Sequence, residues 1–182
     1  MFSAPVRLMG GLSASLAAFQ TGPATAETVA PIVAVDRPAA VALTLRDLGY
    51  RAKLIRDDQD RPVILSGVGG YTFDITFFWC DGEDVCPGLL FSTWFDLDNG
   101  FDLEQINEWN RGQVVGRAFA DADCDPHIDH YVSADPEMSL GAFEQMVVDW
   151  EFALTEFANF IGFQTGAPTA TVASCGAGNS TI

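Results

Sequence analysis

Carboxylates crowd one short run between residues 121 and 129 and are the first candidates for chemistry. They occupy the first, third, fifth and ninth positions of the run, as in the opening of a calcium-binding EF-hand loop: Asp121, Asp123, Asp125 and Asp129. An EF-hand also needs glycine at the sixth position and a bidentate glutamate at the twelfth, where this chain has Pro126 and Val132. The run therefore predicts an acidic turn between two strands and no metal site.

Two histidines stand within or next to this run. His127 and His130 are three residues apart, so in a strand their rings point to opposite faces and form a poor chelate. Asp121, His127 and Asp129 are close enough in sequence to supply the acid and base of a small hydrolase. The sequence has no nucleophile-elbow glycine pattern, no HExxH motif and no phosphate loop. We therefore expect no catalytic residues and no cofactor, with a small hydrolase as the alternative.

The four cysteines form an even number, which in an exported chain favours disulfides. Cys80 and Cys86 bracket a loop between two expected strands, which can bring their Cα atoms within disulfide range. A zinc site would need a second Cys or His pair at tetrahedral spacing, and the sequence lacks one. We predict a Cys80–Cys86 disulfide, and the pairing of Cys124 with Cys175 stays open.

A short amphipathic helix is expected just before the acidic run. Asp102 is a suitable N-cap, with Gln105 at the capping-box position, and Gly112 is a C-terminal stop signal. Trp109 falls on the apolar face of this helix together with Leu103 and Ile106. We therefore predict that Trp109 anchors the helix to the sheet.

Asparagines lie on the border of the same helix, at Asn107 and Asn110. Such amides most often satisfy backbone groups of a neighbouring turn, so we expect a structural role in preference to ligand binding. The alternating run from Val114 to Ala122 predicts the strand that follows. One face of that strand has only small side chains, which lets a helix pack closely, and Arg117 on the other face needs a carboxylate or carbonyl partner if it is covered.

The remaining chain predicts one compact domain with a sheet and further helices. Hydrophobic periodicity gives a helix over 41–50, a hairpin of strands over 52–55 and 63–68, strands over 71–80 and 89–95, and a long helix over 139–163. The strand over 71–80 should bury a continuous apolar face that ends in Trp79.

The two ends of the chain differ from its middle. Residues 1–26 resemble a cleavable export signal, residues 27–40 are expected to be a linker, and residues 164–182 are expected to form a flexible tail after a domain over 41–163. We therefore expect a periplasmic or secreted protein without a membrane span. The net charge of −16 disfavours binding to nucleic acid and favours basic peptides or cations.

Several of these pieces, in this order, are similar to the YbjN domain family of bacterial sensory transduction regulators. The resemblance covers about 41–163 and consists of the cysteine pair, Asn107-x-Trp109-Asn110, Arg117 and the turn Asp121-x-Asp123. Cys124 departs from the family pattern, where glycine commonly follows the second acid. The resemblance implies an α+β fold, an antiparallel sheet backed by helices like type III secretion chaperones, and no established catalytic activity.

The expected function is therefore an exported, non-enzymatic binding or regulatory module. Its partner is expected to be a protein or peptide, with basic residues favoured by the acidic charge, and a homodimer is allowed. A small hydrolase and a cation-binding structural domain are the alternatives. A binding module should present a broad groove or a flat apolar patch, whereas an enzyme should present a pocket in which several polar groups converge.

Overall fold

The computed structural model describes residues 30–163 of the chain. The elements in chain order are β1 (Ile32–Val33), α1 (Pro38–Asp47), β2 (Arg51–Arg56), β3 (Pro62–Val68), β4 (Tyr71–Phe78), β5 (Gly88–Trp94), α2 (Leu103–Gly112), β6 (Arg117–Ala120), β7 (Pro126–Ser133), β8 (Met138–Ser139) and α3 (Leu140–Phe160). Export signal, cleavage site and tail all fall outside the described residues.

The strands form a six-stranded antiparallel sheet in the order β2-β3-β4-β5-β7-β6, and β1 pairs separately with β8. This arrangement, with three helices beside it, confirms the predicted α+β class. The register places Ile64, Ile75 and Phe91 next to one another on adjacent strands, and all three are buried. The buried face of the sheet is thus continuous across β3, β4 and β5.

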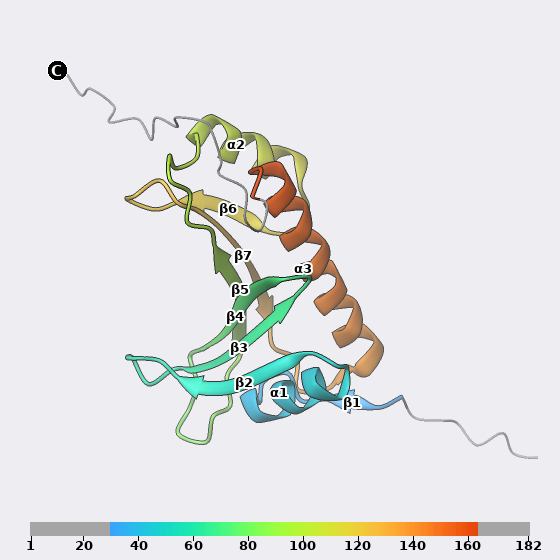
Figure 1. Ribbon diagram of the computed structural model, residues 1–182. Helices are drawn as coiled ribbons and strands as arrows, with labels where there is room; N and C mark the ends of the chain where they lie inside the picture. The colour runs from blue at the N-terminus through green and yellow to red at the C-terminus, as the bar shows by residue number, and fades with distance from the viewer. Residues whose placement is uncertain (1–29, 164–182) are drawn as a thin grey trace, which may run out of the picture.

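Helix α3 covers this buried face along its length (Figure 1). Its predicted apolar stripe is confirmed, because Phe143, Val147, Trp150, Leu154 and Phe157 are fully buried. The indole of Trp150 packs against the rings of Phe73 and Phe91, with centroid distances of 5.8 and 5.6 Å. Helices α1 and α2 pack beside β2 and β6, at the two ends of the sheet.

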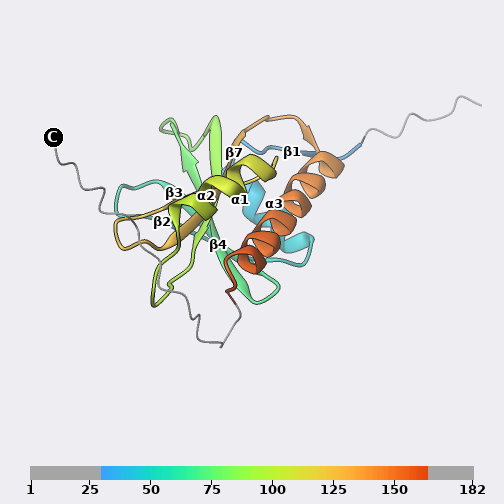
Figure 2. The ribbon, with the colours of Figure 1, turned by 90° about the horizontal axis from the view of Figure 1, so that it is seen from above.

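The opposite face of the sheet, called the open face below, has no helix against it within residues 30–163. Figure 2 shows α3 on one side of the strands, as in Figure 1. Side chains on the open face follow from the register: Leu90 lies beside Tyr131, and Asp129 lies between Ser92 and Arg117. An antiparallel sheet with one solvated face is a common arrangement.

The end of β4 differs from the prediction. Phe73, Ile75 and Phe77 are buried as expected, but the strand stops at Phe78 and the Trp79 side chain is 70% exposed. Trp79 has a φ of 57°, in the left-handed region, and this breaks the alternation of faces. The indole lies over Gly88 on the open face, where a Cβ atom would stand 2.7 Å from the Trp79 ring.

Strand β6 is shorter than the predicted strand over 114–122. It begins at Arg117 because Gly116 has a φ of 83° and turns the chain there. A Cβ atom on Gly116 would lie 2.7 Å from Ile128 and 3.4 Å from the Cβ atom of Ala153 in α3. The close approach of strand and helix expected from the small residues is therefore present at this glycine.

The hairpin, the fourth strand and the acidic turn between β6 and β7 lie where the sequence predicts them. Helix α1 starts and ends earlier than expected, because Pro38 stands in its first turn and Leu48 caps its end. Part of the segment over 27–40 that was expected to be a linker is folded, since β1 and the first turn of α1 belong to it. None of the helices within residues 30–163 has the length and hydropathy that a membrane crossing requires.

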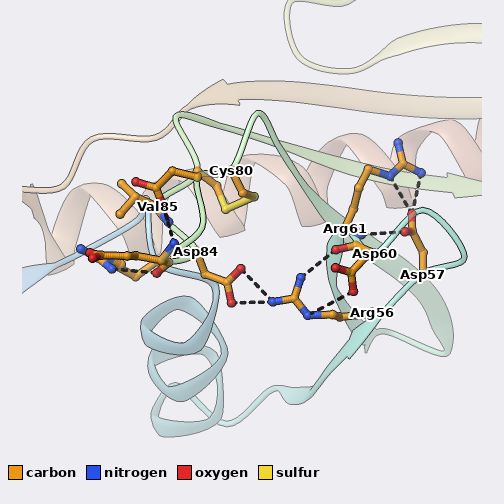
Figure 3. Close-up of a disulfide and its surroundings, with 11 residues drawn as sticks. Arg56, Asp57, Asp60, Arg61, Cys80, Asp84 and Val85 are labelled. Atoms are coloured by element: carbon orange, nitrogen blue, oxygen red, sulfur yellow. Dashed lines mark hydrogen bonds and ion pairs between the residues drawn. A yellow bond between two sulfur atoms is a disulfide. The ribbon is translucent and has the colours of Figure 1, made fainter.

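The structure contains a disulfide between Cys80 and Cys86, with a Cα–Cα distance of 4.0 Å. The loop that it closes is tied to the hairpin of β2 and β3, because Arg56 donates to both carboxylate oxygens of Asp84 at 2.6 and 2.8 Å (Figure 3). Cys86 is fully buried, and its amide donates to the carbonyl of Asp36 at 2.8 Å. The disulfide thus fixes a loop that contacts both β2 and the chain before α1.

We expect Cys80→Ala to lower the free energy of unfolding by about 2 kcal/mol, because the short loop loses its covalent closure in the unfolded chain. Chemical denaturation of the variant and the parent measures the difference. Cys80 is the better site for substitution, since truncating the fully buried Cys86 would also open a cavity. Equal stability of the two proteins, or free thiols at both positions in the parent, would contradict the assignment.

Candidate functional site

Trp109 is a core residue of the described domain. Asp102 caps α2 by accepting a hydrogen bond from the Glu104 amide at 2.7 Å, which sets the start of the helix. The Trp109 side chain is then buried against the rings of Phe157 and Phe160 of α3, at centroid distances of 4.9 and 5.5 Å. Its indole Nε1 donates to the carbonyl of Gly116 at 3.1 Å.

Asn110 joins α2 to β6 through two hydrogen bonds to one residue. Its Nδ2 donates to the carbonyl of Ala118 at 2.9 Å, and its Oδ1 accepts from the amide of Ala118 at 2.8 Å. Strand β6 is the outermost strand at this end of the sheet, so the Asn110 amide takes the place of a further strand. Asn107 is exposed, and its side chain makes no hydrogen bond within residues 30–163.

Arg117 and Asp129 form an ion pair on the open face. Arg117 Nε donates to Asp129 Oδ1 at 3.0 Å, and a second guanidinium nitrogen donates to Oδ2. The Asp129 side chain is nearly buried, whereas the Arg117 side chain is mostly exposed and lies over the ring of Phe119. The carboxylate partner that the sequence required for Arg117 is therefore its neighbour across β6 and β7.

The acidic turn is held by Asp121. Its Oδ1 accepts from the amides of Asp123 and Asp125 at 3.0 Å, and its Oδ2 lies 3.1 Å from Nε2 of His127. The hydrogen bond with His127, followed by those from the backbone, holds the pKa of Asp121 below its ordinary value. These bonds therefore support the turn above the ordinary pKa of an aspartate and are lost as the pH falls through the lowered pKa.

Cys124 stands in the acidic turn where the resemblance drawn from the sequence leads us to expect glycine. Its φ is 70°, in the left-handed region that glycine adopts without strain. The turn is nevertheless closed, because the Asp121 amide donates to the Asp125 carbonyl at 3.1 Å. The pairing of Cys124 with Cys175, which the sequence leaves open, involves a residue outside the described part of the chain.

The acid and histidine named for a hydrolase are only partly brought together. Asp121 contacts His127, but both oxygens of Asp129 are bound by Arg117. The imidazole of His127 stacks on Phe119 and on Trp94, with centroid distances of 4.7 and 6.4 Å. Its two faces are therefore packed on aromatic rings, and within residues 30–163 its hydrogen-bond partner is Asp121.

A second group of aromatic rings lies farther along the open face. Trp79 packs edge-on against Tyr131, at a centroid distance of 6.0 Å, and both rings meet over Gly88. The side chains of Trp79, Trp94 and Tyr131 are 70%, 58% and 49% exposed. We call this surface the aromatic face and define it by its exposed rings: Trp79, Trp94, Phe119 and Tyr131.

The aromatic face does not follow from the sequence pattern. The alternation from Tyr71 continues through Trp79 and predicts that Trp79 is in the core, and no pattern gives Trp94 or Tyr131 a role. The exposure of Trp94 can be predicted from the alternation of β5, because Leu89 and Phe91 point into the core and Trp94 therefore points to the opposite face. The ring of Trp79 could not be placed in this way, since it depends on one left-handed residue.

A cleft of about 530 Å³ opens beside the start of β6, at Arg117. It is lined by residues of α2, of the turn before β6, and of β5, β6 and β7: Leu90, Asn110, Gln113, Val114, Gly116, Arg117, Asp129, His130 and Tyr131. Four of the residues singled out from the sequence thus lie at this cleft: Asn110, Arg117, Asp129 and His130. Asp121 and Asp123 lie in the turn at the other end of β6. Residues 30–163 hold no group of three His, Cys, Asp or Glu side chains arranged to bind a metal ion.

Comparison with protein families gives a match over residues 37–163 of the 182. The chain belongs to the YbjN family. The family is described as "Putative bacterial sensory transduction regulator". The YbjN match covers every element of the six-stranded sheet and all three helices, and it begins one residue before α1. No curated protein matches the chain.

Trp109→Ala should lower the free energy of unfolding by about 3 to 5 kcal/mol, because it removes a buried ring and leaves a cavity beside Phe157. Thermal and chemical denaturation measure this loss. A variant that unfolds like the parent would show that Trp109 does not support the packing of α2 on α3.

Asn110→Asp should cost about 1 to 3 kcal/mol, because a carboxylate can accept from the Ala118 amide but cannot donate to the Ala118 carbonyl. Asn107→Asp is the matched control, since it makes the same change on the exposed side of the same helix and should cost under about 0.5 kcal/mol. Equal losses in the two variants would contradict the role given to the Asn110 amide.

Proposed function

We propose that this YbjN domain is an exported regulatory module that binds a protein partner through its aromatic face. The observation that supports the proposal most directly is the exposure of Trp79, Trp94 and Tyr131 on a sheet face that has no helix against it in the described chain. Tryptophan and tyrosine are the residues most enriched at the energetic centres of protein interfaces. Exposed aromatic rings gathered on one face of a folded protein are typical of an interaction site.

Arginine side chains border both groups of rings. Arg61 lies over the ring of Phe78 at 5.2 Å, and the Phe78 ring is 5.9 Å from that of Trp79. Arg117 lies over the ring of Phe119 at 5.5 Å. Each arginine is also paired with a carboxylate, Asp57 for Arg61 and Asp129 for Arg117. A surface of rings with fixed charges at its border supports specific recognition, because a partner must match both the apolar area and the charges.

Export is part of the same proposal and has separate support. A disulfide inside the described domain is typical of proteins that fold in an oxidising compartment, and residues 1–26 have the pattern of an export signal. We place the module in the periplasm or outside the cell. The expected likeness to type III secretion chaperones agrees with a protein-binding role and stays a prediction.

The test is a pull-down from a periplasmic extract with the parent and two variants immobilised in parallel. Replacing both Trp79 and Trp94 by alanine should abolish capture of the partner at unchanged thermal stability, because both rings are mostly exposed. Phe152→Ala is the matched control, since it truncates an exposed ring of similar size on α3, which covers the opposite face.

The expected result is a protein held by the parent and by the Phe152 variant and lost by the double tryptophan variant. The proposal is wrong if the three proteins capture the same set, or if the parent captures nothing beyond what the resin retains. Intact mass of the exported protein, which should begin after Ala26, tests the export part independently of the partner.

A further inference from the structure

The edges of the sheet carry backbone groups that need partners, and side chains satisfy some of them at both ends of the sheet. At one edge, Arg46 donates from Nε to the carbonyl of Ala52 in β2 at 2.8 Å. At the other edge, Asn110 bonds both backbone groups of Ala118 in β6. Covering an edge in this way prevents another chain from adding a strand to it.

A stretch of the edge of β7 has no such cover. Strand β6 pairs only with the first half of β7, from Ala120 opposite Pro126 to Arg117 opposite Asp129. The second half of β7, residues 130–133, has β5 on one side and no strand on the other within residues 30–163. At the end of this stretch the cover resumes, because the Val35 amide donates to the carbonyl of Asp135 at 3.3 Å.

The direction of the backbone groups can be derived from two hydrogen bonds between β5 and β7. The Phe95 amide donates to the carbonyl of Pro126, and the Ala134 amide donates to the carbonyl of Pro87. Backbone groups of successive residues in a strand point to alternate sides, so even-numbered residues of β7 bond to β5. The amide and carbonyl of Tyr131 and of Ser133 therefore point toward the uncovered edge.

Two hollows meet along this edge. The cleft of about 530 Å³ lies at the Arg117 end, and a hollow of about 490 Å³ lies between residues 130–133 and the first turns of α3. His130 and Tyr131 line both of them. A strand added here would thus have room for side chains on both faces, with Tyr131 and Leu90 on one side and Met146 and Asp149 on the other.

The charge around the edge determines which kind of chain can bind there. Arg117 is the one cation lining the two hollows, and it is bound to Asp129. Asp149 lines the second hollow, and the exposed Asp135 and Glu137 follow the end of β7. A second copy would bring the same acidic edge and its own net charge of −16 against this one, which is unfavourable, whereas lysine or arginine side chains would be attracted.

We propose that the edge of β7 at Tyr131 and Ser133 binds a short extended peptide segment that carries lysine or arginine. The peptide adds a strand of about four residues between Gly116 and the Val35–Asp135 bond, and its basic side chains lie near Asp149 and Asp135. This inference deepens the proposed function by naming the chemistry of the partner, and it rests on that function for the presence of a protein partner.

The experiment measures amide hydrogen exchange of the isotopically labelled full protein by NMR, with and without a capped hexapeptide of alternating lysine and valine. Exchange at Tyr131 and Ser133 should slow about tenfold or more at saturating peptide, because their amides gain partners. The amide of Val132 points to β5 and should change little, which makes it an internal control. The glutamate analogue of the peptide should bind at least about tenfold more weakly.

Substitution at the edge gives a matched pair. Ser133→Pro removes the outward amide and obstructs an added strand, while Ser133→Ala keeps the amide and loses only the hydroxyl. The alanine variant should bind the lysine peptide like the parent, and the proline variant should lose it while keeping the parent's melting temperature within a few degrees. If the proline variant fails to fold, the exchange measurement on the parent still decides the question.

Several outcomes would overturn the proposal. Protection of both amides without peptide would mean that the edge is already occupied, by a second copy if the protection depends on protein concentration and by the chain's own remaining residues if it does not. Equal binding of the lysine and glutamate peptides would remove the charge argument. In a third outcome the peptide binds without slowing exchange at Tyr131 and Ser133, and binding is lost when Trp79 and Trp94 are replaced. The peptide would then bind the aromatic face, and the proposed function would stand without the edge site.

Discussion

The packing of α3 across the sheet is the interaction on which the rest of this domain depends. Trp150, fully buried between Phe73 and Phe91, is at the centre of that contact. A single helix of 21 residues can cover only one face of six strands, so the smaller helices are needed at the two ends. With α3 on one face and the smaller helices at the ends, no helix of the described residues covers the open face, and the exposed rings lie there.

Hydrogen bonding at the edges is the second constraint. The side chains of Arg46 and Asn110 satisfy backbone groups of Ala52 in β2 and of Ala118 in β6 that a further strand would otherwise bind. Two residues of the segment singled out from the sequence are explained by this need, because Trp109 fixes the helix on α3 and Asn110 then reaches the edge of β6, whereas Asn107 is exposed. The motif is therefore part of the scaffold beside the binding surface.

The elements and the core were predictable because hydrophobic periodicity reports burial directly. The stripe of α3, the buried phase of β4 and the placement of the disulfide all follow from spacing and from the flanking residues. The candidate site was not predictable to the same degree. The exposure of the Trp79 ring depends on the left-handed backbone conformation of Trp79. The uncovered edge of β7 depends on the length of β6, which begins only after Gly116, where the chain turns close to Ile128. Both are properties of tertiary contacts that a local pattern does not contain.

The distribution of tryptophan has a spectroscopic consequence. All four indoles lie in the described domain, and they divide evenly between Trp109 and Trp150, which are excluded from solvent, and Trp79 and Trp94, which are mostly exposed. The first two emit from an apolar environment and the last two from water, so the intrinsic fluorescence of the folded protein contains a blue component from the core and a red, quencher-accessible component from the aromatic face. One unlabelled sample therefore carries separate optical reporters for the integrity of the fold and for the occupancy of its uncovered surface.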